Sequence, residues 1–171
     1  MSTVLDTITS RSSIRKYTDQ PIPQDICRTI IEAGLKAPTA ANRQEIHITV
    51  TAGSDPVNQE IQNDMNPNAP VNFYYNAPVV FYLSGPDAFK WSAVDAGIAV
   101  QNMHLAAADL GLGSVILGCM EATLNGEKKA KYAKKLAFPE GHSYLVALAV
   151  GYPDTAKEPH AFDFEKNVTI L

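Results

Sequence analysis

The stretch FKWSAVDAGIAVQNMHLAAADLGLGSVILG, residues 89–118, decides the fold. Small and apolar side chains occupy nearly every helical position of its first part, which predicts one long helix over 89–110, buried on all sides. Small side chains let neighbouring backbones approach closely, so this helix is either the centre of the domain or the seam between two subunits. The glycine-flanked apolar run that follows predicts a strand over 114–117.

Helical and extended patterns flank this helix on both sides. The helix before Pro38 must end ahead of it, because proline disfavours the helical region for the residue that precedes it. The hydrophobic periods predict helices over 4–8, 26–35, 55–65 and 122–136, and strands over 46–50, 78–83 and 144–150. Two helices come together at the start, which indicates an α+β or a mixed α/β fold in a single domain, 1–171, rather than a regular doubly wound sheet.

Length, composition and charge restrict the class of protein. A chain of 171 residues can bury a sizeable core, and 46% hydrophobic against 19% charged residues indicates that surface is also buried by a partner. The formal net charge of -4 argues against a protein that wraps nucleic acid, which needs a basic face. The apolar residues 168–171 would form an added strand, either on this chain's own sheet or on a partner's.

The cysteines, the histidines and the N-terminal residues indicate a cytoplasmic protein without a metal. Cys27 and Cys119 have no CxxC partner, which favours free thiols in a reducing compartment. The four histidines are never spaced i, i+4 and never stand beside a cysteine, so we assign no metal site. The start lacks the pattern of a signal peptide, and no stretch has the length to cross a bilayer.

A basic segment near the start, RSSIRK over 11–16, has the composition of a phosphate site. Two arginines and two hydroxyls within five positions supply fork-shaped charged donors and adaptable neutral ones, which suit a cluster of phosphate oxygens. The chain as a whole is acidic, so this positive charge is local. A solvated basic surface is the alternative interpretation, and for an isolated segment it is the commoner one.

Two further segments offer hydrogen-bonding groups to a ligand. The loop APTAANRQ, 37–44, places two amides and a hydroxyl before a strand, which suits a pyrimidine-like ring; a loop that merely ends a helix is the alternative. The glycines of 111–118 would let backbone amides approach a ligand, but they follow a helix and form no dinucleotide fingerprint. Since the chain has no nucleophile motif and no paired carboxylates, a bound cofactor is expected to supply the chemistry.

In their order and separations these segments resemble the FMN-dependent nitroreductase family, specifically its short members, over essentially the whole chain. Arg11, Ser13 and Arg15 match its opening pattern Arg-X-Ser-X-Arg/Lys. The loop matches its pattern Ala-Pro-Ser/Thr-X-X-Asn-X-Gln at Ala37, Pro38, Thr39, Asn42 and Gln44. The remaining matches are Asn76 to Pro78, Asp95 to Gly97, Gln101 and Asn102, Gly111 to Gly113, Gly118, and Val150 to Pro153.

The resemblance implies an α+β sandwich, with a mixed and mainly antiparallel central sheet flanked by helices, in an intertwined homodimer with FMN at its interface. Members pass a hydride from NADH or NADPH to the flavin and then to a small acceptor such as a nitroaromatic or a quinone, so no side chain is catalytic. By position, the phosphate and ribityl chain would be held by Arg11, Ser12, Ser13 and Arg15. Thr39, Asn42 and Gln44 would border the ring, and the backbone amides of Leu117 and Gly118 would face its reactive edge.

Two positions depart from the family pattern. Glu45 and Ile46 stand where members commonly have proline and an aromatic residue, which changes the contacts beside the ring. His160 stands where an arginine that helps to bind phosphate is usual, so phosphate binding would be weaker or pH-sensitive. Two other functions therefore stay open: flavin binding without NAD(P)H turnover, and specialised chemistry that fragments FMN or removes halogen from an aromatic. The stretch 58–76 is the one candidate for a lid.

Overall fold

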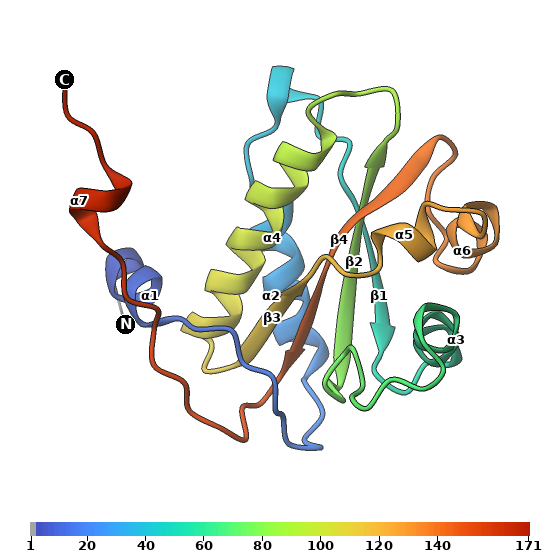
Figure 1. Cartoon of the computed structure of the whole chain (residues 1–171), viewed down its shortest axis with the longest axis horizontal. Helices are drawn as coiled ribbons and strands as arrows, with labels where there is room; N and C mark the ends of the chain where they lie inside the picture. Colours follow the sequence, from blue (N-terminus) through green and yellow to red (C-terminus); the bar gives the residue numbers. More distant parts are fainter. Residues whose placement is uncertain (1–2) are drawn as a thin grey trace.

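The computed structural model describes residues 3–171, which are built on a four-stranded antiparallel sheet with the strand order β1-β2-β4-β3 (Figure 1). The strands are β1 (His47–Ala52), β2 (Val79–Pro86), β3 (Gly113–Leu117) and β4 (His142–Gly151). The central pair, β2 and β4, places Phe81 opposite Leu148, and both side chains are fully buried. All four strands lie where the apolar runs predict them, and the α+β class is confirmed.

Local sequence explains where some of the helices begin or end. The helices are α1 (Val4–Ser10), α2 (Gln24–Leu35), α3 (Pro56–Met65), α4 (Ser92–Asp109), α5 (Glu121–Leu124), α6 (Lys129–Lys135), α7 (Phe164–Asn167) and the short 3-10 helix η1 (Ala40–Asn42). Thr3 and Asp6 form a capping box at the start of α1, and the Asp55 carboxylate accepts from the Val57 N–H (2.9 Å) at the start of α3. α2 ends before Pro38, as predicted.

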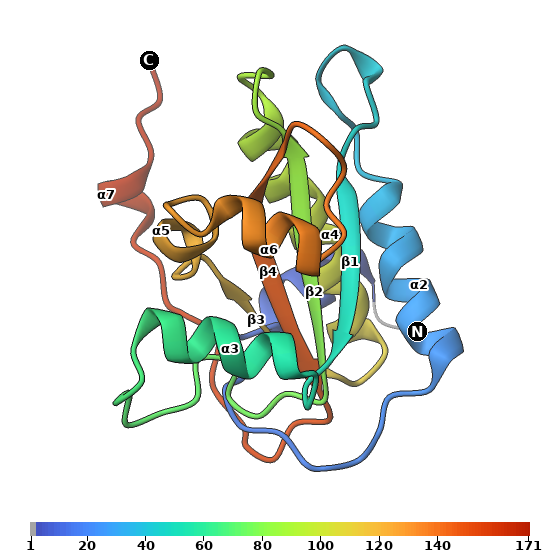
Figure 2. The same ribbon diagram turned by 90° about the vertical axis from the view of Figure 1, so that its right-hand side faces the viewer.

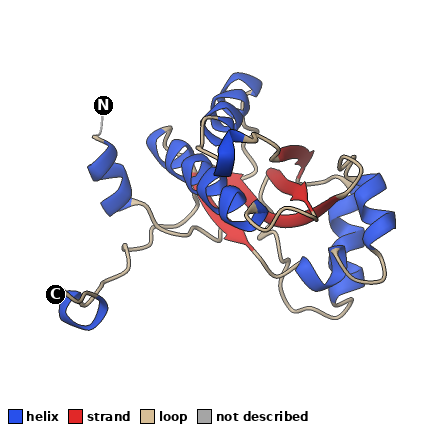
Figure 3. Ribbon diagram, turned by 90° about the horizontal axis from the view of Figure 1, so that it is seen from above, coloured by secondary structure: helices blue, strands red, loops and turns tan. Residues whose placement is uncertain are grey.

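Helices cover both faces of the sheet. Because side chains alternate along a strand, β2 sends Phe81 and Leu83 to one face and Val80 and Tyr82 to the other. α2 and α4 pack on the first face, and α3, α5 and α6 pack on the second (Figure 2). Figure 3 shows the sheet between these two helical layers.

Within the described chain α4 is buried on one side, so the burial on all sides predicted from its sequence would need a second subunit and stays a prediction. Its inner side packs Ala99 and Met103 against the sheet and α2. The outer side of its first half leaves Val94 49% and Ile98 37% exposed. Neither α4 nor any other helix of residues 3–171 is long and apolar enough to cross a membrane, and the compartment stays a prediction.

The lysine-rich stretch 122–136 forms two helices, α5 and α6, and not the single predicted helix. Asn125 breaks the pattern: its side chain donates to the Tyr144 carbonyl oxygen (2.8 Å) and accepts from the Tyr144 N–H (3.0 Å). These two bonds tie the break to the first part of β4. The break thus combines a local turn signal, Asn125–Gly126, with a tertiary contact.

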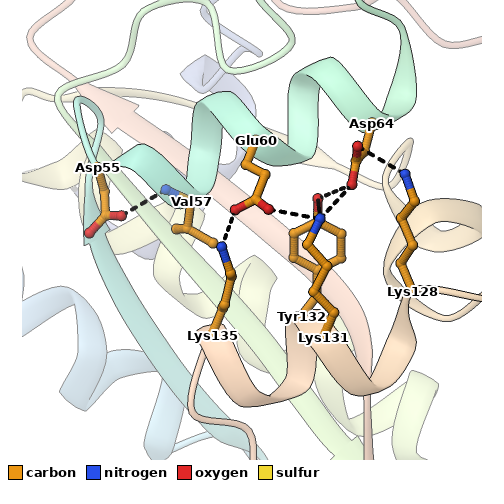
Figure 4. A network of polar contacts seen from close by, with 8 residues as sticks. All are labelled: Asp55, Val57, Glu60, Asp64, Lys128, Lys131, Tyr132 and Lys135. Carbon is orange, nitrogen blue, oxygen red and sulfur yellow. Dashed lines mark hydrogen bonds and ion pairs between the residues drawn. The ribbon is translucent and has the colours of Figure 1, made fainter.

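α3 and α6 are joined by a network of surface ion pairs, shown in Figure 4. The pairs are Lys128–Asp64 (2.9 Å), Lys131–Asp64 (2.9 Å), Lys131–Glu60 (2.7 Å) and Lys135–Glu60. The Tyr132 hydroxyl, from a ring packed under α6, donates to Asp64 (2.5 Å). The network joins α3 to α6 across the outer surface of their shared layer.

The C-terminal tail lies away from the sheet (Figure 1). Every residue from 153 to 171 is exposed, and Ile170 is 84% exposed although it is apolar. Residues 168–171 form no strand, so an added strand on the chain's own sheet is wrong. A strand on a partner's sheet stays a prediction.

Candidate functional site

The basic segment 11–16 runs along the open edge of β3. Ser13 forms a parallel bridge with Ser114, and the Ile14 N–H donates to the Ser114 carbonyl oxygen (3.0 Å). Ile14 packs against Gly113, where an added Cβ would lie 2.8 Å from the Ile14 side chain. Arg11, Ser12 and Ser13 are half-buried and Arg15 is exposed, so the predicted phosphate ligands are fixed by the strand at one end and open to solvent at the other.

A buried histidine holds the first of these arginines. Nη1 of Arg11 lies 3.0 Å from Nε2 of His104, and Nδ1 of His104 is hydrogen-bonded to the Ser114 hydroxyl. Burial, and secondly the charge of Arg11, lower the pKa of His104 to about 4, so the ring is neutral at pH 7. The sequence gives only a weak signal for this contact, a histidine within an otherwise small and apolar helix.

The loop 37–44 adopts a backbone that ordinary side chains avoid. Ala41, Asn42 and Gln44 have φ of 53°, 53° and 55°, in the left-handed region, which costs about 1–3 kcal/mol per non-glycine residue. Thr39 supports this shape, because its hydroxyl oxygen accepts from the Gln44 N–H (2.9 Å). The Gln44 amide in turn donates to the Asn42 side-chain oxygen (3.0 Å), so the two predicted ring ligands orient one another.

Asp95 of α4 also holds the loop 37–44 in place, a role that the sequence analysis did not predict. Its carboxylate accepts from the Ala40 N–H (2.9 Å) and is only 4% exposed. A loop that only ends a helix needs no such support from another element. The strain, the support from Thr39 within the loop and the external restraint from Asp95 together indicate a loop shaped for a purpose beyond chain reversal.

An open cavity of about 790 Å³ lies beside this loop, and Thr39, Asn42 and Gln44 are all part of its wall. The remaining wall comes from the end of α2, from Ile46 and from Ala99 of α4. Cavities of about 300–1,000 Å³ with apolar walls and a few placed polar groups are typical of sites for small molecules and cofactors. The three amide and hydroxyl side chains predicted from the loop motif are therefore brought together on one cavity.

Glu45, where the family commonly has proline, forms an ion pair. Its carboxylate bonds Arg43 twice, and the Arg43 guanidinium lies 4.4 Å from the centre of the Phe89 ring. The hydrogen bonds from Arg43 lower the pKa of Glu45. Since Gln44 and Ile46 on either side of it line the cavity, Glu45 adds a charged pair at the cavity's edge where a ring contact is usual.

The three glycines of 111–118 have different surroundings. Gly111 has a φ of 76° and ends α4, and Gly113 makes room for Ile14. An added Cβ at Gly118 would meet nothing within 4 Å, so its surroundings are open. Leu117 is buried, and its carbonyl oxygen accepts from the Tyr144 hydroxyl (2.5 Å).

The predicted site residues form two groups at opposite ends of α4. The loop group is anchored at Asp95 and the arginine group at His104, nine residues later, or about 14 Å along the helix axis. Figure 1 shows η1 beyond one end of α4 and the segment after α1 near the other. His160 belongs to neither group: it lies in the exposed tail and, within residues 3–171, forms no hydrogen bond with the predicted site residues.

Comparison with known proteins places the chain in a family. The family described as "Nitroreductase family" matches residues 8–70 and 54–152. The chain is 30% identical to the NADPH-flavin oxidoreductase of Vibrio harveyi over 170 residues, which cover 92% of this chain and 69% of that protein. It is 28% identical to the NAD(P)H-dependent FMN reductase of Bacillus subtilis, over 93% of this chain and 70% of that protein. The crystal structure of a Bacteroides fragilis nitroreductase with bound FMN superposes with a TM-score of 0.88 at 26% identity, covering all of both chains. Extent of match, fold and motif order agree, and the chain belongs to the nitroreductase family.

Proposed function

We propose that the protein is an FMN-dependent oxidoreductase that passes a hydride from NADH or NADPH to the flavin and then to a small acceptor, such as a nitroaromatic or a quinone. The observation that carries the proposal is the loop 37–44, held in a left-handed backbone with its amides on the wall of the cavity. Family membership supports it, as do the flavin reductases among the relatives.

The residues present fit FMN. Arg11 and Arg15, with the hydroxyls of Ser12 and Ser13, would hold the phosphate and ribityl chain, because fork-shaped charged donors match phosphate oxygens. The side chains of Thr39, Asn42 and Gln44 would border the ring from the cavity wall. The open surroundings of Gly118 leave space for the ring edge beside the backbone amides of Leu117 and Gly118.

When bound, FMN would supply the hydride chemistry itself, and the protein would bind and orient it. Arg11 and Arg15 would stabilise negative charge on the cofactor, at about 1.5–3 kcal/mol for each charged hydrogen bond. Asp95 is buried and already accepts from the Ala40 N–H, so its role is to shape the loop rather than to transfer a proton. No side chain of the site is assigned a catalytic proton.

We also propose that the site is completed in a homodimer. The two groups of ligands lie about 14 Å apart along one α4, and a two-fold pairing would bring the loop group of one copy to the arginine group of the other. The exposed outer side of α4, with Val94 and Ile98, is the apolar surface that such a pairing would bury. The apolar tail, with His160, would then lie against the second copy.

The visible absorption spectrum of the FMN-reconstituted protein tests the function. A bound flavin band that bleaches when NADH or NADPH is added without oxygen is the expected result, with Arg11→Ala/Arg15→Ala as the variant that should hold no flavin. A bound band that persists would instead establish the second candidate, a flavin-binding protein without turnover, which the departure at Glu45 favours. Absence of a bound band in the wild type would contradict both.

A further inference from the structure

We propose that His104 and Ser114 are positioning residues that hold the Arg11 guanidinium ready for the phosphate of the cofactor. The inference rests on the proposed FMN site for its ligand, but the contact itself is formed by the chain alone. His104 touches no predicted ligand other than Arg11, and it belongs to none of the motif positions.

The direction of each hydrogen bond follows from the chemistry of the groups. Arginine only donates, so Nε2 of His104 accepts from Nη1 of Arg11 across 3.0 Å. The proton of the neutral ring therefore lies on Nδ1, which donates to the Ser114 hydroxyl oxygen. The two partners thus select one tautomer of His104.

The contacts close into a ring through the backbone. Ser114 fixes His104 by its hydroxyl and fixes the basic segment by its carbonyl oxygen, which accepts from the Ile14 N–H (3.0 Å). Arg11 is therefore tied to Ser114 twice, once through its own side chain and once through the backbone three residues later. His104 is 1% exposed and Ser114 2% exposed, so water does not compete for the bond between them.

The contact with His104 restrains the Arg11 side chain but leaves most of its N–H donors free for a ligand. One of its five N–H donors is used by His104, and the others remain for a ligand. A neutral acceptor also suits this place better than a carboxylate, which would cancel the charge that the phosphate needs. Burial lowers the pKa of the ring to about 4, so His104 stays an acceptor at neutral pH.

A matched pair of amide substitutions tests the proposal. In His104→Gln the amide oxygen reaches about as far as Nε2 and can still accept from Arg11, whereas in His104→Asn the shorter amide reaches only Ser114. Flavin fluorescence quenching at pH 7 measures the Kd of FMN. We expect His104→Gln to stay within about threefold of the wild type and His104→Asn to bind about tenfold more weakly, because a restrained arginine loses less rotamer entropy on binding.

Two measurements separate positioning from a general effect on the fold. In an Arg11→Ala background, His104→Asn should cause no further loss, since the two substitutions remove the same interaction; an equal tenfold loss there would overturn the proposal. His142→Asn is the control, because His142 also pairs with a serine, Ser84 (3.3 Å), at another place in the sheet. It should leave the Kd unchanged.

The tautomer of His104 gives a readout without cofactor. Nitrogen-15 NMR of the FMN-free protein should show the proton on Nδ1, and a proton on Nε2 would overturn the proposal because that atom could not accept from Arg11. A wild type that shows the Nδ1 tautomer but binds no FMN would contradict the proposed function and the phosphate role of Arg11, while the restraint on Arg11 would stand. The two failures are therefore distinguishable.

Discussion

Polar contacts on the two faces of the sheet are built in opposite ways. On the α4 face, single contacts of buried groups fix the site: Asp95 to the loop, and His104 to Arg11. On the α3 face, surface lysines and half-buried carboxylates form several ion pairs that share partners and remain accessible to water (Figure 4). Buried contacts have no water to replace a lost partner, whereas exposed charges regain it. The α4 face should therefore be sensitive to single substitutions and the α3 face tolerant of them.

The largest effect is expected for Arg11→Ala/Arg15→Ala. Loss of two charged phosphate contacts, at about 1.5–3 kcal/mol each, should weaken FMN binding by about a hundredfold or more while the fold is kept. Equilibrium dialysis against FMN and a thermal melt measure the two properties. Lys16→Ala is the control, because it removes a positive charge from the same segment but one that is paired with Asp154 (2.7 Å). Full retention of FMN by the double variant would contradict the phosphate assignment.

Asp95→Ala should produce the largest loss of stability on the α4 face. The Ala40 N–H then loses its acceptor and the strained loop loses its support, which should lower the free energy of unfolding by about 1–3 kcal/mol. Asp95→Asn keeps an acceptor oxygen and should lose less. Urea unfolding of the two variants makes the comparison, and equal losses would show that the charge, not the hydrogen bond, supports the loop.

Ala41→Gly should stabilise the protein, an unusual outcome for a substitution to glycine. Ala41 has a φ of 53°, where glycine avoids a steric cost of about 1–2 kcal/mol, although its extra freedom in the unfolded chain offsets part of the gain. Ala40→Gly is the matched control, because Ala40 is not among the residues with positive φ. This substitution should destabilise the protein by about 0.5–1 kcal/mol. Urea midpoints that move in the same direction for both would contradict the strain argument.

The sequence predicted the elements that depend on local pattern and missed those that depend on distant contacts. The strand at Val79–Pro86 follows from an apolar run, and the end of α2 from Pro38. The break between α5 and α6 depends on Asn125 meeting Tyr144, nineteen residues away, and no helical period contains that information. The sequence likewise shows that the C-terminal tail contains apolar residues, but it does not show what covers them.

The candidate site divides in the same manner. The loop residues Thr39, Asn42 and Gln44 could be predicted because a short motif carries all three. Asp95 and His104 could not be assigned a role, because each acts on a residue more than fifty positions earlier in the chain. Periodicity describes both simply as positions of a long helix.

The ion-pair network of the α3 face should respond weakly to substitution and in a pH-dependent way. Hydrogen bonds from Lys131 and Lys135 lower the pKa of Glu60 below its ordinary 4.5, and bonds from Tyr132, Lys128 and Lys131 lower that of Asp64. Carboxylates with a depressed pKa in the folded state stabilise it above their unfolded pKa, and the contribution is lost as the pH falls through the folded pKa. The stabilisation is thus present at pH 7 and declines in acid.

Glu60→Gln/Asp64→Asn tests this sign. The melting temperature of the variant should lie slightly below that of the wild type at pH 7, by less than for Asp95→Ala, and the gap should narrow between about pH 5 and pH 2. High salt at pH 7 should narrow it too, because exposed ion pairs are screened. A gap as large as that of Asp95→Ala would show that the two faces do not differ as proposed.

The smallest effect is expected for His160→Arg. This substitution adds a charge in the tail, outside both the α4 face and the α3 face of the sheet. His160 is exposed in the tail, so an arginine there gains contact with phosphate only if a second copy brings its site to the tail. An exposed charged contact contributes about 0.2–1 kcal/mol, which predicts FMN binding that is tighter by about fivefold at most and sensitive to salt. Titration of FMN at low and high salt measures it, with His160→Gln as the uncharged control. Equal affinities for the two variants at low salt would show that the tail takes no part in phosphate binding and that the arginine group at the edge of β3 holds the phosphate without it.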